Sequence, residues 1–392
     1  MEENRSMRIL TALGVIFVVA GHLQFDILSL GGLFPYYSFH LYIFLFVTGY
    51  FYKPEDENHL GAFFLRKAKR LLLPYFIWNL LYGILSTVLY KNGIYIGGLI
   101  DLRNLFLEPF LGGHQFMYNS PAWFVVAHFV VEALYILGRK LVGLIVSKFA
   151  KNAAFWTDMI VLGGTLLAGI LTIYLAIGGH VWGLWKTPGR WLIMLPGVQF
   201  GRVFKEYIEP YLEKKIPNRN TSIKYNIIFF VVILTIQYVI KNLCAGLAIS
   251  VVWCSSFANG PIIPFVTAIT GVAFWLRVAS LLSLIKGNVL TTIGKNSYSI
   301  MTHQFTVLFT INSLCMILDK RGILKAPFDI MSYKTSVNFQ CLYAGYHGTH
   351  FINTVLCIAI PILIGFLVMP QDKAQDTAQD NTGEKTRKRT EK

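Results

Sequence analysis

Residues 8–30 read RILTALGVIFVVAGHLQFDILSL, a stretch that is long and apolar enough to cross a membrane. About 20 apolar residues span the hydrocarbon of a bilayer. The stretch nevertheless begins with Arg8 and contains His22 and Asp26. Ionisable side chains at membrane depth are costly and usually face a protein interior or a wet cavity. These residues therefore predict a first membrane span that carries functional polar groups.

If this stretch is one continuous helix, its three ionisable residues share a face. His22 and Asp26 are four residues apart, and Arg8 lies 14 residues before His22. Arg8 and His22 are then separated by roughly 21 Å along the axis, at about 1.5 Å per residue. We expect Asp26 to hold the imidazole in one tautomer, so that His22 acts as a general base on a hydroxyl. The alternatives are that His22 is a polar contact between helices and that Asp26 is solvated at the outer surface.

The composition predicts an all-α, polytopic integral membrane protein. Of 392 residues, 55% are hydrophobic and 14% are charged, whereas soluble proteins carry about 25% charged residues. We see no internal repeat and no second domain, so residues 1–369 are predicted to form one transmembrane domain. The hydrophilic, basic tail at 370–392 is expected to be disordered. Ten spans are predicted, at 8–30, 34–52, 71–90, 121–138, 157–178, 187–204, 225–241, 261–284, 297–318 and 349–369.

The positive charges indicate the orientation of these spans. Of the 35 Lys and Arg residues, 25 fall in the segments on the side of the two termini, and nine fall on the other side. Cytoplasmic segments are enriched in Lys and Arg, so both termini are predicted to be cytoplasmic in a multi-pass protein of the cell membrane. The same rule explains the formal charge of +15 without nucleic acid as a partner.

A cluster of basic residues precedes the third predicted span. Residues 63–76 read FFLRKAKRLLLPYF, after a polar loop predicted from residue 53. Arginine forks suit phosphate, so Arg66 and Arg70 are candidates to bind an anionic donor, with Arg8 on the same side. The alternative is an ordinary basic flank of a membrane span.

Other polar residues within the predicted spans are weaker candidates. His40 in FHLYIFLFVTGYF and His303 in GKNSYSIMTHQF are candidates for substrate binding or for structural contacts. Glu132 and Arg277 are expected to pair with each other. We find no metal-ligand cluster, no activated nucleophile motif and no paired spacing among the five cysteines, so neither a metal nor a disulfide is predicted.

Five segments together resemble the membrane-bound acyltransferase 3 family over roughly residues 5–369. They are VIFVVAGH (15–22), FHLYIFLFVTGYF (39–51), RKAKRLLLPYF (66–76), PAWFVVAHF (121–129) and GKNSYSIMTH (294–303). The resemblance implies about ten helices, an acyl-CoA donor, a glycan acceptor and a catalytic role for His22. It further suggests donor contacts for Arg66 and Arg70 and a site role for His303. The family often has a basic residue where this chain has Thr11, so Arg8 is expected to substitute for it.

The leading functional hypothesis is therefore a membrane-bound O-acyltransferase. It would move an acyl group, acetyl in the simplest case, from cytoplasmic acyl-CoA to a hydroxyl of a cell-surface glycan. The alternative is a transporter of a glycan or lipid-linked sugar, which would use the same polar residues as a pathway. Transporters more often show repeats or paired broken helices, and we see neither apart from Pro196 and its neighbouring glycines.

Overall fold

A computed structural model describes residues 4–112, 116–181, 183–217, 220–243, 251, 255, 257, 259–324, 328–341 and 348–368. All regular elements within these residues are helices, as the composition predicts. Part of the loops around residues 113 and 342, and the tail predicted at 370–392, lie outside the described residues.

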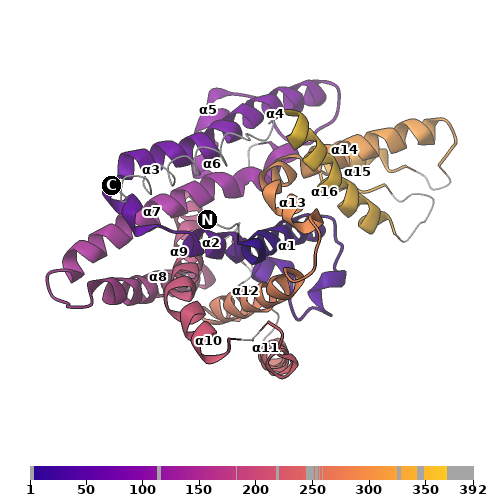
Figure 1. The fold of residues 1–392 in the computed structure, drawn as a ribbon. Helices are drawn as coiled ribbons and strands as arrows, with labels where there is room; N and C mark the ends of the chain where they lie inside the picture. The colour runs from indigo at the N-terminus through magenta and orange to yellow at the C-terminus, as the bar shows by residue number, and fades with distance from the viewer. Residues whose placement is uncertain are drawn as a thin grey trace, which may run out of the picture.

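The helix α1 (Arg5–His22) lies at the centre of the bundle (Figure 1). The side chain of Asn4 caps its first turn by accepting a hydrogen bond from the Met7 amide, at 3.1 Å. Helices from both halves of the chain pack around it, so it is buried on most sides. These neighbours are α2 (His40–Tyr50), α12 (Ile263–Leu282), α13 (Val289–Lys295), α14 (Ser297–Lys320) and α16 (Thr349–Val368).

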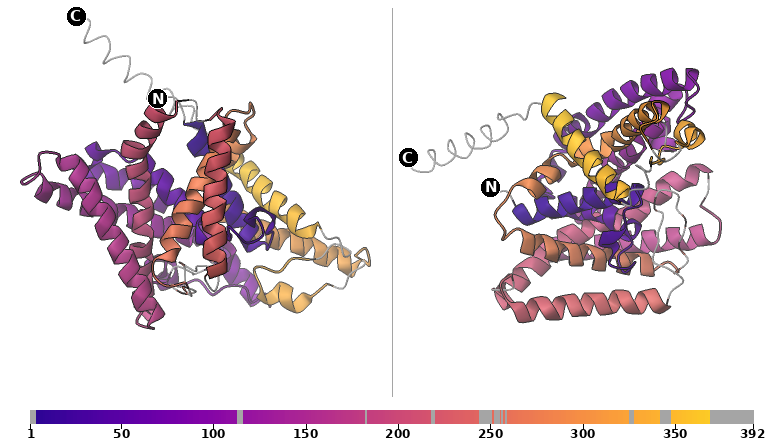
Figure 2. Two further views of the ribbon diagram at one scale, coloured as in Figure 1. Left: turned by 90° about the horizontal axis from the view of Figure 1, so that it is seen from below. Right: turned by 90° about the vertical axis from the view of Figure 1, so that its right-hand side faces the viewer.

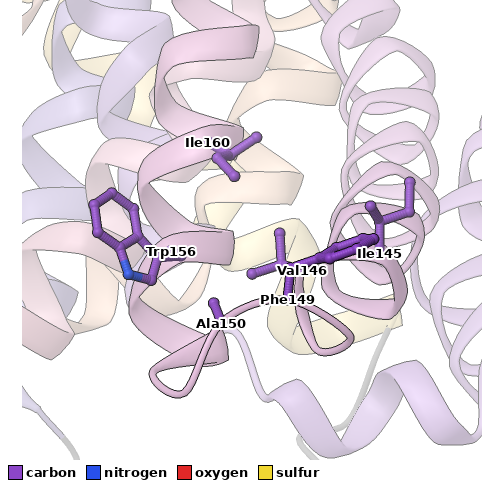
Figure 3. Close-up of a pocket in the computed structure, with 6 residues that line it drawn as sticks. All are labelled: Ile145, Val146, Phe149, Ala150, Trp156 and Ile160. Carbon is purple, nitrogen blue, oxygen red and sulfur yellow. The ribbon is translucent and has the colours of Figure 1, made fainter.

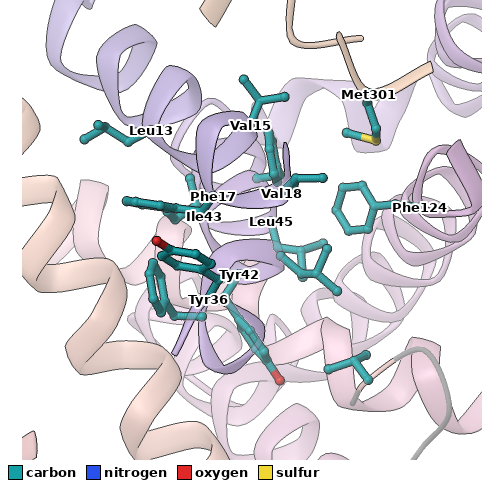
Figure 4. Packing of buried hydrophobic residues seen from close by; sticks show 14 of the residues in the cluster. Leu13, Val15, Phe17, Val18, Tyr36, Tyr42, Ile43, Leu45, Phe124 and Met301 are labelled. Carbon is teal, nitrogen blue, oxygen red and sulfur yellow. The ribbon is translucent and has the colours of Figure 1, made fainter. Parts of the chain in front are cut away.

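Aromatic and branched side chains fill the space between α1, α2 and α12 (Figure 4). Phe17 of α1 is fully buried, and its ring lies 5.4 Å from that of Tyr36 and 4.6 Å from that of Trp275. Such ring pairs add to the stabilisation gained by burial. This packing fixes the C-terminal half of α1, where His22 lies.

Glycines allow α2 to lie directly against α9 (Lys186–Val203). A Cβ atom at Gly49 would lie 1.7 Å from the carbonyl oxygen of Val198, and one at Gly201 would lie 1.9 Å from that of Phe46. Only glycine permits such an approach of two backbones. The small residue Gly49 therefore brings the two helices together.

The outer layer of the bundle consists of helices whose apolar side chains are largely exposed. Helix α11 (Ile223–Leu243) lies at the lower edge in Figure 1 and in the right view of Figure 2, and it exposes Ile227, Val231 and Tyr238. Exposed apolar rows of this length suit contact with lipid. The other layer members are α4 (Leu73–Lys91), α7 (Trp123–Val146) and α8 (Ala153–Ile177).

A helix occupies part or all of each of the ten segments predicted to span the membrane. Six helical stretches are long and apolar enough to cross a membrane by themselves, among the residues that the structure describes. Helix α2 has only 11 residues, or roughly 17 Å at about 1.5 Å per residue. The number of ten crossings and the cytoplasmic orientation of the termini therefore remain predictions.

The first helix is shorter than expected. We expected a helix through Leu30, but α1 ends at His22. Gln24 has a left-handed φ of 57° and Leu30 one of 51°, which a continuing right-handed helix cannot contain. The expectation that His22 and Asp26 share one helix face is therefore wrong.

The basic segment before α4 is also different from the expected loop. Helix α3 (Leu60–Lys67) continues through a π-helical turn, η4 (Ala68–Leu72), into α4. Proline has no amide hydrogen, and its ring would clash with the carbonyl group four residues earlier. The widened turn therefore gives Pro74 room beside the carbonyl group of Arg70. Such turns are frequent at functional sites.

Candidate functional site

His22 is the last residue of α1, and its ring lies among aromatic side chains. The ring is 5.0 Å from that of Phe305 on α14 and 6.5 Å from that of Tyr37, both in edge-on geometry. The side chain is partly exposed, whereas Leu23 beside it is buried. His22 therefore lies at the margin of the packed core, where a ligand can reach it.

Two side chains from the end of the chain hold the residue that follows His22. The carbonyl oxygen of Leu23 accepts hydrogen bonds from Nε2 of Gln340, at 2.8 Å, and from Nδ1 of His350, at 2.9 Å. Gln340 in turn accepts a bond from the side-chain amide of Asn353, at 3.0 Å. This group could not be predicted from the sequence, because Gln340 and His350 lie more than 300 positions from Leu23.

His40 lies near His22 and is separated from it by Tyr37. The rings of Tyr37 and His40 are 5.5 Å apart. Nδ1 of His40 lies 2.5 Å from the carbonyl oxygen of Tyr36, which can only accept a hydrogen bond. Nδ1 therefore carries the proton, and in the neutral ring Nε2 has the free lone pair. The structure thus gives His40 the fixed tautomer that a base requires.

His303 lies on the opposite side of α14 from the His22 contact. Residues two positions apart on a helix do not face each other, and it is Phe305 that touches His22. The ring of His303 lies 4.3 Å from that of Trp78, and its Nδ1 is 2.5 Å from the hydroxyl of Tyr82. The structure therefore places His303 against α4, in a separate buried contact.

Asp26 and Arg8 lie at opposite ends of this region. Asp26 is exposed and precedes the short helix η1 (Ile27–Ser29) without capping it through its side chain. Arg8 is in the second turn of α1, where a Cβ atom at Gly294 of α13 would lie 2.3 Å from its carbonyl oxygen. Gly294 thus allows α13 to pack against the segment that carries Arg8.

The two arginines expected to bind the donor differ in their ion pairing. Arg66 is half exposed and forms an ion pair with Asp56, at 2.8 Å. Arg70 is exposed in the π-helical turn, and its side chain forms no ion pair within the described part of the chain. Arg70 is therefore the better placed of the two for an anionic ligand.

A buried polar group next to this segment was missed by the sequence analysis. Lys67 lies 2.5 Å from Glu132 on α7, and Nε2 of His128 lies 3.3 Å from the same carboxylate. Nε2 of His128 is also 2.8 Å from the hydroxyl of Thr48 on α2. Since both partners face one ring nitrogen, the group does not have the geometry of a hydrolase triad, which uses both nitrogens.

The expected pairing of Glu132 with Arg277 is therefore wrong. Arg277 instead bonds the side-chain oxygens of Asn226, at 2.6 Å, and Asn220, at 2.8 Å. Both residues of the expected pair are buried and find nearer partners on the helices beside them. The spacing along the sequence does not reveal which helices are neighbours.

The described residues contain no metal-ligand cluster, and the hollow between α7 and α8 is apolar. No group of three or more His, Cys, Asp or Glu side chains that could hold a metal ion exists among the described residues. A hollow of about 330 Å³ lies at the turn between α7 and α8 (Figure 3). It offers no polar group for a reaction, because its lining is formed by Ile145, Val146, Phe149, Ala150, Trp156 and Ile160.

Comparison with known proteins assigns the chain to a family. Residues 4–369 match the profile of the acyltransferase 3 family, which is described as an acyltransferase domain. No curated protein and no solved structure matches the chain. The match gives no support to the transporter alternative. It covers the helices that carry His22, His40, His303 and Arg70 and nearly the whole length of the sequence, so the chain belongs to the acyltransferase 3 family and is a membrane acyltransferase.

Proposed function

We propose that this acyltransferase transfers an acyl group, acetyl in the simplest case, from cytoplasmic acyl-CoA to a hydroxyl of a cell-surface glycan. His22 is the general base in this proposal. The observation that carries it is the position of His22, partly exposed at the end of a central helix. The next residue, Leu23, is held through its carbonyl oxygen by Gln340 and His350. A catalytic group needs such support from rigid neighbours.

The chemistry requires only one proton-transfer group. His22 accepts the proton of the acceptor hydroxyl as its oxygen attacks the thioester carbonyl carbon. The new ester C–O bond forms, the C–S bond breaks, and the leaving thiolate takes the proton back from the imidazolium. The reaction is therefore balanced without a metal or a covalent intermediate on the enzyme.

The arrangement of charges supports a donor that enters from the end of the bundle that carries Arg8. Arg8 and His22 are separated by roughly 21 Å along α1, at about 1.5 Å per residue. Arg70 belongs to the segment that the charge distribution places on the same side as Arg8. Phosphates held at that side would leave an extended thioester arm directed towards His22, while the glycan hydroxyl approaches from the other end.

Replacement of His22 tests the proposal. Glutamine keeps hydrogen bonding and bulk but cannot accept and return a proton, so His22→Gln should lower the transfer rate at least about 10²-fold. The assay follows labelled acetyl groups from acetyl-CoA to isolated surface glycans in membranes that contain the protein. His180→Gln is the matched control, because His180 is exposed in the turn after α8.

A near-normal rate of His22→Gln would show that His22 is a contact between helices rather than the base. Transfer that fails even with the unaltered protein and every surface glycan offered would instead contradict the proposed reaction. Thermal unfolding of each variant in detergent separates a catalytic effect from a loss of folding.

A further inference from the structure

Asn312 binds an extended segment of the chain to α14. Its side-chain amide donates to the carbonyl oxygen of Phe339, at 2.7 Å, and its side-chain oxygen accepts from the amide of Cys341, at 2.9 Å. Asn312 is 3% exposed, so these bonds are shielded from water. Residues 339–341, which we call the clamp segment, are thus fixed against one face of the helix.

This arrangement brings two cysteines together. Cys315 is three residues after Asn312 and lies on the same face of α14. Cys315 and Cys341 are 3% and 5% exposed, and their thiols are in hydrogen-bonding contact. Burial, together with the neighbouring sulfur, raises the pKa of the Cys341 thiol to about 12. Cys357 on α16 is equally buried and is not part of this contact.

The clamp segment also touches the end of α1. Gln340, between Phe339 and Cys341, donates to the carbonyl oxygen of Leu23 at 2.8 Å. Leu23 directly follows His22. Whatever fixes the clamp segment on α14 therefore also fixes the position of His22.

We propose that Cys315 and Cys341 form a disulfide that fastens the clamp segment to α14 and holds the end of α1 in place. Each thiol loses its hydrogen, a bond forms between the two sulfur atoms, and an external disulfide is reduced to two thiols by exchange. The predicted orientation puts this segment outside the cytoplasm, where disulfides persist. The effect on transfer rests on the proposed function, whereas the bond itself does not.

The timing of this step follows from the burial of the two residues. Only the thiolate attacks a disulfide, and a buried thiol of high pKa is a poor nucleophile. Exchange must therefore occur during folding, before the clamp segment packs against α14. Once formed, the buried bond is shielded from mild reductants and is opened only by a strong, membrane-permeant reductant.

Mass spectrometry tests the bond directly. The protein is extracted from membranes without reductant, its remaining thiols are alkylated in denaturant, and its peptides are compared before and after reduction. We expect a linked peptide pair that contains Cys315 and Cys341 and disappears on reduction, with Cys357 alkylated throughout. Full alkylation of Cys315 and Cys341 without reductant would overturn the proposal.

The effect on His22 is tested by activity and stability. Strong reductant should lower the transfer rate of the unaltered protein severalfold. It should also lower the Tm of that protein by several degrees. The variant Cys341→Ala should be insensitive to reductant, and the control Cys357→Ala should respond as the unaltered protein does. Because the reductant acts on the unaltered chain, the test does not depend on folding of the variant.

The outcomes separate this inference from the proposed function. A linked peptide pair with a transfer rate that does not respond to reduction would overturn the positioning role of the bond. The absence of transfer by the oxidised, folded protein would contradict the proposed function and leave the mass-spectrometric result standing.

Discussion

The structure gives each of the three candidate histidines a different chemical setting. His22 is partly exposed beside Phe305 and Tyr37. His40 is 6% exposed, with its Nδ1 proton fixed on a backbone carbonyl group. His303 faces Tyr82 on another helix. Access favours His22 as the base, whereas the fixed tautomer favours His40.

Replacement of His40 by asparagine distinguishes these two histidines. The amide nitrogen of asparagine can replace Nδ1 as the donor to the carbonyl oxygen of Tyr36, but nothing replaces Nε2. If His22 is the base, His40→Asn should retain most of the transfer rate. His40→Phe should lower stability by about 1 kcal/mol through the lost hydrogen bond, measured as a lower Tm. A folded His40→Asn protein that loses transfer by about 10²-fold would assign the base to His40.

Arg70 and Arg66 should differ in their effect on the donor. Arg66 is already paired with Asp56, whereas Arg70 is exposed without an ion pair in the described residues. We expect Arg70→Ala to raise the KM for acyl-CoA more than Arg66→Ala does, with the KM for the acceptor unchanged. Arg70→Lys should restore the KM only in part, because lysine lacks the bidentate fork.

The control for this prediction is Arg103→Ala. Arg103 is also exposed and paired with a carboxylate, Glu108, but its loop is predicted to lie on the opposite side of the membrane. Equal donor KM values for Arg70→Ala and Arg103→Ala, measured from initial transfer rates, would leave Arg70 as a topology signal alone.

Ionisable residues were visible in the sequence as candidates, but their partners were not. Their cost in a membrane made His22, His40 and Glu132 stand out without structural information. The partners of Leu23 and Glu132 come from other helices, and the order of helices around a bundle does not follow from composition. The sequence therefore indicated which segments carry polar side chains, but it did not reveal which residues contact one another.

At the scale of helices, glycines decide which pairs come into close contact. The approach of α2 to α9 depends on Gly49 and Gly201, whereas no atom lies within 4 Å of a Cβ at Gly163 or Gly164 on α8. Glycine thus permits a close helix contact in α2 but makes no such contact at these positions of α8, although both helices are apolar. Residue type alone could not identify α9 as the partner of Gly49, because the glycines of α8 look the same in the sequence.

An alanine at each of these positions measures the difference. Gly49→Ala places a Cβ atom 1.7 Å from the carbonyl oxygen of Val198, so one of the helices must move. Overpacking of this kind costs about 1–3 kcal/mol or more. Gly164→Ala should instead be neutral or stabilise the helix by up to about 1 kcal/mol.

The measurement is thermal unfolding in detergent, followed by the retained transfer rate. A lower Tm is expected for Gly49→Ala only. Equal Tm values of both variants would contradict the role of Gly49 as the contact point between α2 and α9.

At the scale of the whole molecule, polar contacts join segments of the chain at each of the two ends of the helices. At one end, Arg139 bonds Asp158 at 3.0 Å and also pairs with Glu57, and Arg5 donates to the carbonyl oxygen of Ile285 at 2.7 Å. At the other end, Gln340 bonds Leu23 and the amide of Tyr95 bonds the carbonyl oxygen of Lys334 at 2.7 Å. Three of these contacts join segments that the charge distribution places on the same side, namely Arg139 with Glu57, Arg5 with Ile285 and Tyr95 with Lys334.

Fold class and family could be predicted from the sequence, because both depend on many residues spread over the whole chain. Apolar length and low charge predicted helices in a membrane, and five ordered segments predicted the acyltransferase 3 family, which the profile match confirms. Helix ends depended on single residues such as Gln24 and Pro74. Hydropathy averaged over many residues does not reveal the backbone geometry at one residue. Which end of the bundle faces the cytoplasm still rests on the count of charges.

Helix α9 is the decisive element for the number of crossings. It has 18 residues, or roughly 27 Å at about 1.5 Å per residue, but it is absent from the six stretches that are apolar enough to cross alone. Its buried charges explain why. Arg190 donates to the carbonyl oxygen of Gly112 at 3.0 Å, and Arg202 bonds Glu206 at 2.8 Å. A helix surrounded by α2, α7 and α8 faces protein, so it does not need the hydropathy of a lipid-facing helix.

We therefore predict that α9 crosses the membrane and that both termini are cytoplasmic. Leu184, before α9, and Lys214, after it, are exposed and suit labelling of single introduced cysteines. In intact cells an impermeant maleimide should modify Leu184→Cys, as it should the outer reference Asp101→Cys. Lys214→Cys should react only after the cells are permeabilised, as should the inner reference Lys151→Cys, and the unaltered chain gives the background. Labelling of Leu184→Cys and Lys214→Cys from the same side would show that α9 does not cross the membrane. The two termini would then lie on opposite sides, and the positive-inside rule would no longer explain the split of 25 to nine positive charges.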